Sequence, residues 1–269
     1  MNLKGRVATV TGAGSGIGRA TSMALARRGC HLALADINTV GLKDTARMAE
    51  ALGVRVTCHT LDVASRAQVQ SLPAEVHAGH GRIDILVNNA GVALGGTFEQ
   101  VSEADFDWLM DINFHGVVRM TRAFLPYLRA GDDARIVNVS SLYGLISPAG
   151  QAAYSASKFA VRGFSNALRH ELEGSCVGVT VVHPGGVATS IAKNARVPAG
   201  VAEEEVQRRK ELADKLLRMP PEKAGDIIVR GIERRKARIL VGMDAKIVSL
   251  IERIAPVAYW ALLKKGIPE

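Results

Sequence analysis

Four glycines stand in the run Thr11-Gly12-Ala13-Gly14-Ser15-Gly16-Ile17-Gly18, close to the start of a chain of 269 residues. The apolar segment Val7–Val10 precedes this run and reads as a buried parallel strand. Residues 19–28 follow it and read as a helix that Gly29 closes. The sequence therefore predicts a strand, a glycine-rich turn and a helix in direct succession.

This glycine loop is suited to holding a phosphate group. Backbone N–H groups at the start of a helix, together with the helix dipole, attract the pyrophosphate of a dinucleotide. Gly12 permits the tight turn, while Gly16 and Gly18 allow close approach of the ligand and of the helix. The spacing is G-x-x-x-G-x-G rather than G-x-G-x-x-G, so an ordinary glycine-rich connection is the alternative. The predicted ligand contacts in the loop are Gly12, Ser15, Gly16, Ile17 and Gly18.

Helical and strand-like segments alternate along the chain, which is typical of a parallel sheet with helices on both faces. Further strands are predicted at residues 31–35, 54–58, 85–87, 135–139 and 179–182. The chain is 48% hydrophobic, which is enough for one sizeable core. We therefore expect a single α/β domain over residues 1–269, built on a Rossmann-type doubly wound parallel sheet.

Composition and residue patterns argue against a secreted, a membrane-spanning, a metal-binding or a nucleic-acid-binding protein. The first strand begins at about residue 6, which leaves no room for a signal peptide, and no apolar run is long enough to span a bilayer. Cys30, Cys58 and Cys176 are scattered, as in a reduced cytoplasmic protein, and no His/Cys cluster predicts a metal site. The net charge of +8 admits nucleic acid as a partner, but no nucleic-acid-binding motif accompanies it, so we expect none.

Tyr154 and Lys158 are one helical turn apart, so both side chains project from one face of a helix. An ammonium beside a phenol favours the phenolate, so we expect the pKa of Tyr154 to fall toward neutrality. A tyrosine adjusted in this way can pass a proton to or from a substrate oxygen. The pair by itself is weak evidence, because Tyr and Lys share helix faces by chance in many proteins.

Three motifs together are more specific. Thr11–Gly18 follows the pattern T-G-x-x-x-G-x-G, residues 88–91 read Asn-Asn-Ala-Gly, and Tyr154 and Lys158 form Y-x-x-x-K. In this order the chain resembles the classical short-chain dehydrogenase/reductase family over roughly residues 3–240. The resemblance implies an NAD(P)-dependent oxidoreductase that interconverts a hydroxyl and a carbonyl without a metal.

Asp36 ends the second predicted strand, about 20 residues beyond the glycine loop. An acidic residue there accepts hydrogen bonds from the adenosine ribose and repels the extra phosphate of NADP. Ile37 follows where a basic residue would have welcomed that phosphate, so we favour NAD. Two alternatives stay open: Asp36 could cap the next helix, or Arg19 could reach the ribose and admit NADP.

The resemblance assigns further residues to the cofactor. Asp62 and Val63 would lie against the adenine, and Asn89, with its neighbours in the central turn, would contact the cofactor or steady the sheet. The turn after the sixth strand would contact the nicotinamide carboxamide and the phosphates. The residues assigned in this way are Asp62, Val63, Asn89, Ala90, Gly91, Tyr154, Lys158, Pro184, Gly185, Val187 and Thr189.

The resemblance also implies a catalytic set of Asn113, Ser141, Tyr154 and Lys158. Ser141 precedes Tyr154 by thirteen residues and would hydrogen-bond the substrate oxygen. Ser140 is adjacent, but alternation along the strand gives the two serines opposite directions. Asn113 would distort its helix and hold a water that relays protons to Lys158, although a lone Asn in a helix is usually a packing residue.

Two segments near the end of the chain read differently from the rest. Residues 190–219 are polar and charged, and at this position we expect a lid over the substrate. The arginines in it, Arg196, Arg208 and Arg209, could meet an anionic group, but we expect them to face solvent. Residues 243–265 form a predicted helical extension in which Tyr259 and Trp260 lie beside apolar residues and terminal lysines. The extension would pack on the substrate pocket or a neighbouring subunit, or touch a membrane surface.

The motifs and the resemblance together predict an NAD-dependent oxidoreductase that interconverts a hydrophobic secondary alcohol and a ketone, with a primary alcohol and an aldehyde as the alternative. Small residues at Ala156, Ala160 and Gly163 allow close approach of another helix, so we expect a homodimer or homotetramer, with packing inside the chain as the alternative. Other hypotheses are an NADPH-dependent carbonyl reductase, an enoyl reductase, and a non-catalytic nucleotide-sensing scaffold. A scaffold would be expected to lose Tyr154 or Lys158, and this chain retains both.

Overall fold

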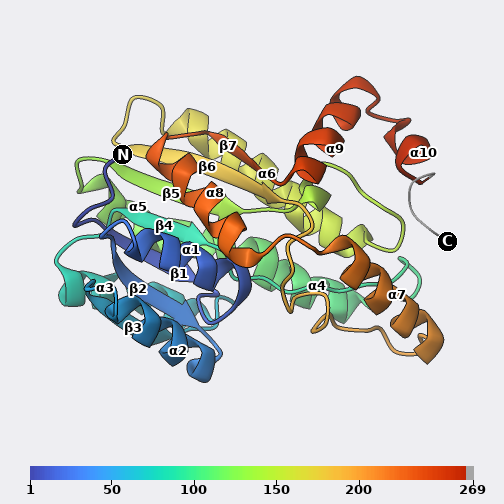
Figure 1. The fold of residues 1–269 in the computed structure, drawn as a ribbon, viewed down its shortest axis with the longest axis horizontal. Helices are drawn as coiled ribbons and strands as arrows, with labels where there is room; N and C mark the ends of the chain where they lie inside the picture. The colour runs from blue at the N-terminus through green and yellow to red at the C-terminus, as the bar shows by residue number, and fades with distance from the viewer. Residues whose placement is uncertain (265–269) are drawn as a thin grey trace.

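A seven-stranded parallel sheet runs through the computed structural model, which describes residues 1–264 (Figure 1). The strand order is β3-β2-β1-β4-β5-β6-β7. The strands are β1 (Val7–Thr11), β2 (His31–Asp36), β3 (Val56–Thr60), β4 (Ile85–Asn88), β5 (Ala134–Val139), β6 (Val177–Pro184) and β7 (Arg238–Val241). The order reverses between β1 and β4, and such a reversal opens a crevice at the carboxyl ends of the strands.

Helices cover both faces of the sheet, as the alternating sequence predicts. One layer contains α1 (Gly16–Ala26), α2 (Thr39–Glu50) and α8 (Pro221–Glu233), and the other contains α3 (Arg66–His80), α5 (Gly116–Arg129) and α6 (Ala152–Glu171). Consecutive strand residues serve opposite layers: Leu86 belongs to the core under α3 and α5, and Val87 to the core under α1 and α8. The fold class predicted from the sequence is confirmed.

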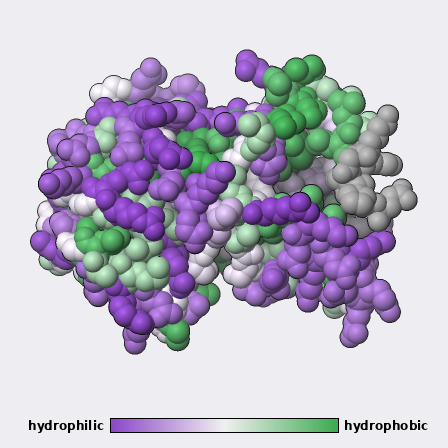
Figure 2. All heavy atoms as spheres, viewed as in Figure 1, coloured by the Kyte–Doolittle hydropathy of each residue, from purple (hydrophilic) through white to green (hydrophobic). Residues whose placement is uncertain are grey.

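Short and peripheral elements surround the carboxyl edge of the sheet. They are α4 (Glu103–Met110), the π-helical turn η1 (Asp111–His115), the 3-10 turn η2 (Leu142–Gly144), α7 (Glu203–Leu216), α9 (Met243–Ile254) and α10 (Tyr259–Lys264). In Figure 1, α7 and the pair α9–α10 stand apart from the layered body on the same side of the molecule. Figure 2 shows hydrophobic side chains over α9 and α10 and hydrophilic ones over α7.

Three strands differ by more than one residue from the sequence-based expectation, and the sixth strand, expected at 179–182, extends over Val177–Pro184. The third strand was expected at 54–58 and occupies Val56–Thr60, because the Arg55 N–H donates to His31 Nδ1 at 3.0 Å and the ladder with β2 begins only at Val56. The seventh strand, β7, was not predicted from the sequence. It is a four-residue edge strand, too short for a clear periodic pattern.

The lid segment also contains more structure than expected. Residues 203–216 form the helix α7, in which no residue is buried. The C-terminal extension is helical over α9 and α10, and its last expected residue, 265, lies outside the described residues. Within residues 1–264, no helix is long and apolar enough to cross a membrane.

Candidate functional site

The glycine loop is closed by backbone contacts that a larger residue would prevent. Gly12 has φ +65 and Gly16 has φ +51, in the left-handed region that glycine adopts without strain. A Cβ on Gly18 would lie 2.0 Å from the Gly12 carbonyl oxygen and 2.5 Å from Asn89 Nδ2. Helix α1 therefore starts in direct contact with the turn that precedes it.

The end of β4 is bonded to this loop. Asn89 Nδ2 donates to the carbonyl oxygens of Thr11 at 2.9 Å and Gly12 at 3.2 Å. The Thr11 hydroxyl accepts from the backbone N–H groups of Asn89 and Ala90, each at 3.0 Å. The structural role considered for Asn89 is therefore observed, and Thr11 is a member of the site that the sequence reasoning missed although it begins the quoted motif.

Asp36 reaches the same loop from β2. Its Oδ2 accepts from the Gly14 N–H at 2.7 Å, and its Oδ1 accepts from the Asn38 N–H at 2.8 Å. The cap of α2 is Asn38, whose Oδ1 accepts from the Gly41 N–H at 3.0 Å. The alternative that Asp36 serves only as the helix cap is therefore wrong, because Asn38 fills that place.

Three further residues considered for the cofactor differ in their exposure: Arg19 is half-buried, Asp62 is exposed and Val63 is buried. Arg19 Nε donates to the Thr45 hydroxyl at 2.9 Å, and its Nη2 donates to the carbonyl oxygens of Gly14 and Gly41. Asp62 is exposed, while Val63 is buried in the core under α5. Arg19 is thus bound to the backbone at both the loop and the start of α2.

The turn after β6 faces the glycine loop. A Cβ on Gly16 would meet Thr189 Cγ2 at 3.1 Å, which places the two turns across a narrow gap. The turn is fixed from behind, since the Gly186 N–H donates to Asp244 Oδ2 at 2.6 Å and a Cβ on Gly185 would collide with the same carboxylate. Pro184 ends β6, and Val187 is buried. Small, backbone-lined surfaces of this kind fit the pyrophosphate and nicotinamide of a dinucleotide.

Tyr154, Lys158 and Ser141 meet at the start of α6, as the spacing predicts. Lys158 Nζ lies 5.6 Å from the centroid of the Tyr154 ring, and the side chain of Lys158 is 4% exposed. The adjacent serines point in opposite directions, since Ser140 Oγ donates to the Lys158 carbonyl oxygen at 2.8 Å, whereas the Ser141 side chain acts on the Tyr154 phenol. Ser141 rather than Ser140 therefore faces the Tyr154 phenol.

Burial dominates the ionisation of this pair. It raises the pKa of Tyr154 to about 12, and a hydrogen bond from the Ser141 side chain opposes this rise. It lowers the pKa of Lys158 to about 8. The expectation that the pKa of Tyr154 falls toward neutrality is wrong for the protein alone, because both groups lose hydration in their charged forms and this loss outweighs their attraction.

Asn113 is fully buried at the centre of the π-helical turn η1. Its Oδ1 accepts from the Val92 N–H at 2.8 Å, and its Nδ2 donates to the Val92 carbonyl oxygen at 3.0 Å and to Ser157 Oγ at 3.2 Å. Ser157 Oγ in turn donates to the Tyr154 carbonyl oxygen at 2.7 Å. The predicted helix distortion is confirmed, and Ser157 is a further positioning residue that no spacing rule indicated.

Other neighbours of the pair were also missed. The Tyr143 ring lies edge-on to the Tyr154 ring with centroids 6.0 Å apart, and its backbone N–H donates to Ser141 Oγ at 3.1 Å. His183 Nδ1 lies 2.9 Å from the Ser141 carbonyl oxygen. Tyr143 follows Ser141 by two residues, so its proximity could have been read from the sequence, whereas that of His183 depends on the pairing of β5 with β6.

The lid arginines are bound more closely than expected. Arg196 Nη1 contacts Asp105 Oδ1 at 2.7 Å, and its guanidinium lies 3.6 Å from the centroid of the Trp108 ring. Arg209 pairs with Glu205 on its own helix. Arg196 and Arg208 are exposed to solvent as predicted and Arg209 is half-buried, but Arg196 is also bound, because α4 presents a carboxylate and an aromatic face to the segment that precedes α7.

The C-terminal extension reaches the same side of the molecule. The Ser147 N–H donates to the Tyr259 hydroxyl oxygen at 3.0 Å, which joins α10 to the loop that begins at Ser141. Four apolar side chains of α9 are exposed, namely Met243, Ile247, Leu250 and Ile254. Within residues 1–264, no group of three or more His, Cys, Asp or Glu side chains is placed to hold a metal.

A family model described as short chain dehydrogenase matches residues 6–199. SadH of Mycobacterium tuberculosis, named as an oxidoreductase, is 44% identical over 269 residues, which are 99% of this chain and 96% of the relative. The 3-oxoacyl-acyl-carrier-protein reductase FabG of Thermotoga maritima is 36% identical and covers 72% of this chain and 78% of its own. A short chain dehydrogenase/reductase from Burkholderia phymatum, crystallised in complex with NAD, has a TM-score of 0.88 at 30% identity, covering 94% of this chain and 95% of the other.

Proposed function

Because the chain belongs to the short-chain dehydrogenase family, we propose that it interconverts a secondary alcohol and a ketone on a hydrophobic substrate, with NAD as cofactor. The observation that carries the proposal is the pairing of the half-buried Tyr154 with the buried Lys158 beside Ser141, at the edge of the sheet that holds the glycine loop. A phenol in a water-poor site beside a hydroxyl is suited to proton transfer at a carbonyl oxygen.

The dinucleotide would be held along the carboxyl edge of the sheet. The N–H groups at the start of α1 would bind the pyrophosphate, Asp36 the adenosine ribose, and Lys158 the nicotinamide ribose. When bound, the nicotinamide supplies or accepts the hydride. The neighbouring turn, Pro184–Thr189, would hold the carboxamide.

Proton transfer falls to Tyr154. Its neutral phenol, which burial favours, would donate a proton to the substrate oxygen in the reductive direction, and its phenolate would take the hydroxyl proton in the oxidative direction. Ser141 orients that oxygen beside the phenol, and the Lys158 ammonium stabilises the phenolate when it forms. Asn113 holds the start of α6 in place and, through a water, would return protons to solvent.

Tyr154→Phe tests the catalytic assignment. We expect turnover of secondary alcohols to fall by roughly 1,000-fold, because general acid–base catalysis contributes about that factor, while the fold and NADH binding are retained. Tyr127→Phe, on the outer helix α5, is the matched control and should keep wild-type rates. Full activity of Tyr154→Phe on a panel of hydrophobic alcohols would refute the assignment, and binding of NADH without any turnover by the wild type would favour the scaffold hypothesis.

The preference for NAD is supported by the position of Asp36. Its carboxylate lies beside the Gly14 N–H, where a 2′-phosphate on the ribose would meet a negative charge. Fluorescence titration with NADH and with NADPH should give tighter NADH binding in the wild type, and Asp36→Asn should reduce the difference. Tighter NADPH binding by the wild type would contradict the proposal and favour an NADPH-dependent carbonyl reductase.

A hydrophobic substrate is supported by the C-terminal extension. Tyr259 is bonded to the loop that begins at Ser141, so α10 borders the substrate side of Tyr154. The segment before α7 is fastened to α4 through Arg196 and would act as a lid on the opposite side. Activity confined to small hydrophilic alcohols would contradict this part of the proposal.

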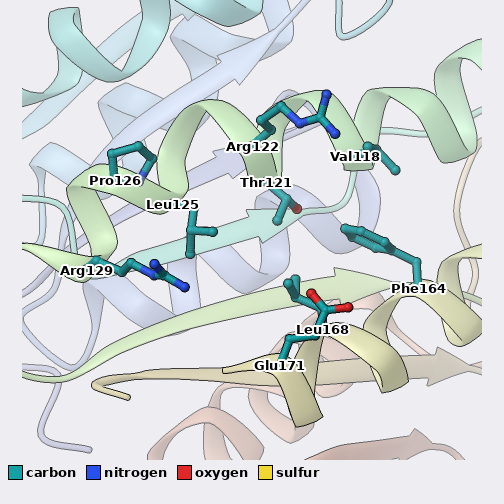
Figure 3. A pocket seen from close by; sticks show the side chains of 9 residues that line it. All are labelled: Val118, Thr121, Arg122, Leu125, Pro126, Arg129, Phe164, Leu168 and Glu171. Atoms are coloured by element: carbon teal, nitrogen blue, oxygen red, sulfur yellow. The ribbon is translucent and has the colours of Figure 1, made fainter. Parts of the chain in front are cut away.

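Self-association is supported by the outer faces of α5 and α6. A hollow of about 540 Å³ lies between these helices, and its apolar lining includes Val118, Leu125 and Phe164 (Figure 3). Gly163 is exposed nearby on α6, and a Cβ there would meet nothing within 4 Å, so packing inside the chain does not account for it. We infer a homodimer or homotetramer through these faces, and a mass of one chain by light scattering would refute it.

Peripheral contact with a membrane is a second inference from the extension. Val257 is 91% exposed and continues the apolar side chains of α9, and Trp260 stands on α10. Lys265, one of the terminal lysines expected in a membrane-surface helix, lies outside the described residues. Flotation with anionic vesicles should carry the protein upward, and Val257→Asp should weaken it. Failure of the wild type to float would contradict membrane contact.

The cytoplasmic location expected from the sequence stays a prediction.

A further inference from the structure

A second hollow lies behind the catalytic serine, between α6 and the last two strands. It has a volume of about 340 Å³, and we call it the arginine hollow. Its polar lining consists of Arg162, Asn166, Arg169, His183 and Arg238. Arg162 follows Lys158 by one helical turn, but the hollow is separate from the substrate side because His183 and the Ser141 backbone stand between them.

Three guanidinium groups converge here without a carboxylate partner. Arg162 Nη1 donates to the Gly144 carbonyl oxygen at 3.2 Å, Arg169 Nη1 to Asn166 Oδ1 at 3.0 Å, and Arg238 Nη2 to Ser249 Oγ at 2.9 Å. All three acceptors are neutral. Within the part of the chain that the structure describes, none of these three arginines forms an ion pair.

The positive charges act on one another. The pKa of Arg238 is lowered, first by burial and then by the charge of Arg162, while Glu252 opposes the change and Arg253 adds to it. Glu252 is therefore near enough to affect the pKa of Arg238, but the two side chains do not form an ion pair. Uncompensated charges this close together create a local field that attracts an anion.

His183 provides an independent indication of a ligand. Its side chain is fully buried, and its Nε2 has no hydrogen-bond partner among the residues of the structure. Because the Ser141 carbonyl oxygen can only accept, His183 Nδ1 must carry the proton of that bond, which leaves Nε2 as an unpaired acceptor in the neutral ring. A buried polar atom without a partner is costly, so a group at this position would be stabilising.

The surroundings of His183 explain why an anion is the expected group. Burial, together with the smaller effects of the Arg238 and Arg162 charges, lowers the pKa of His183 to about 4, and the bond to Ser141 opposes this change. An anion in the hollow would cancel the arginine charges and allow Nε2 to take up a proton. The protonated ring would then donate one hydrogen bond to the Ser141 carbonyl oxygen and one to the anion.

We propose that the arginine hollow is a binding site for a small oxyanion of the phosphate class, held by Arg162, Arg169 and Arg238. Guanidinium groups match phosphate oxygens in pairs of parallel hydrogen bonds, which an isolated lysine cannot do. The volume of about 340 Å³ accommodates inorganic phosphate or the phosphate group of a small ester. A carboxylate from a second copy of the chain is the competing occupant.

The test is calorimetric titration of the full-length protein with sodium phosphate, with sodium chloride at matched ionic strength as the reference. We expect one phosphate per chain, and Arg238→Gln should weaken binding by on the order of tenfold because one charge-assisted contact is lost. Arg162→Gln serves as a second variant, since Arg238 also holds Ser249. Arg27→Gln removes the same charge from an exposed position at the end of α1 and should bind phosphate as the wild type does.

The other outcomes overturn the proposal. Phosphate binding that survives unchanged in Arg238→Gln and Arg162→Gln would place the ion elsewhere, for example at the glycine loop. Equal weakening in all three variants would indicate a general charge effect. A wild type that binds no phosphate, together with a smaller light-scattering mass for Arg238→Gln, would assign the hollow to a carboxylate of a second copy.

Discussion

Two regions of the molecule are stabilised in opposite ways. One is the edge of the sheet that would hold the cofactor. The other consists of the lid segment (residues 190–219) and the helices α9 and α10, which would hold the substrate and which we call the arms. Around Gly18, Asn89 and Asn113, backbone and amide groups are in direct contact and no atom can be added without displacing another. By contrast, α7 has no buried residue, and α9 exposes a row of apolar side chains. A rigid edge suits a ligand of fixed shape, and loosely held arms suit a ligand that varies among relatives.

The arms are nevertheless fixed at particular points. Arg196 connects the lid segment to α4 through Asp105 and Trp108, and Tyr259 connects α10 to the loop that begins at Ser141. These are polar or stacking contacts near the surface, where water competes with each partner. The comparison therefore predicts that substitutions at the edge affect folding, while substitutions in the arms affect substrate binding.

The largest effect is expected at the edge. Gly18→Ala places a Cβ 2.0 Å from the Gly12 carbonyl oxygen, so the backbone must move, and we expect a loss of roughly 3 kcal/mol in the free energy of unfolding. Urea denaturation measures this loss, and NADH titration should show weaker binding. Gly163→Ala, also within a helix, meets nothing within 4 Å in its own chain and should stabilise the chain by about 0.5–1 kcal/mol at a dilution at which the proposed oligomer is dissociated. Equal stability of the two variants would remove the distinction between a packed and an open glycine.

A smaller effect is expected from pH in the packed body. His80 is buried, and burial lowers its pKa to about 4. Between pH 4 and 6.5 the unfolded chain binds more protons at this position than the folded one, so stability rises with pH across that window and is lost as pH falls. His80→Gln should lose less stability on going from pH 7 to pH 5, by roughly 2 kcal/mol, in paired urea titrations. An unchanged pH dependence would contradict the burial argument.

The smallest change in stability is expected in the arms. Arg196→Ala removes the ion pair with Asp105 and the stacking on Trp108, so KM should rise several-fold while the melting temperature and kcat change little. Arg196→Lys retains the charge but not the planar face, and an intermediate KM would separate the two contacts. A large loss of melting temperature in Arg196→Ala would show that the lid is part of the packed body and would abolish the comparison.

Much of the fold could be read from local patterns. The glycine loop between an apolar strand and a helix, and the spacing of Tyr154 and Lys158, depend on backbone geometry that acts within a few residues. Strand alternation likewise predicted that Ser140 and Ser141 point in opposite directions, while the resemblance to the family selected Ser141. The short edge strand β7 was missed because four residues carry too little pattern to be distinguished from a loop.

The ionisation of the site could not be read in this way. The four-residue spacing of Tyr154 and Lys158 predicts attraction between the phenolate and the ammonium. The raised pKa of Tyr154 depends instead on how completely other elements exclude water from the phenol. The stacking of the exposed Arg196 on Trp108, which belongs to a distant helix, could likewise not be read from residue spacing. Desolvation is a property of the packed chain and has no signature in residue spacing.

The sequence by itself determined the order of the elements, the glycine-rich turn between β1 and α1, and the placement of Tyr154 and Lys158 on one helix face, because each depends on short-range backbone geometry. Only the tertiary structure decided which groups are buried together. It placed Asn113 against Val92 and Ser157, His183 behind Ser141, and the three arginines of α6 and β7 around one hollow. Contacts between residues that are distant in sequence arise from strand order and helix packing, which bring these side chains together only when the whole sheet has formed.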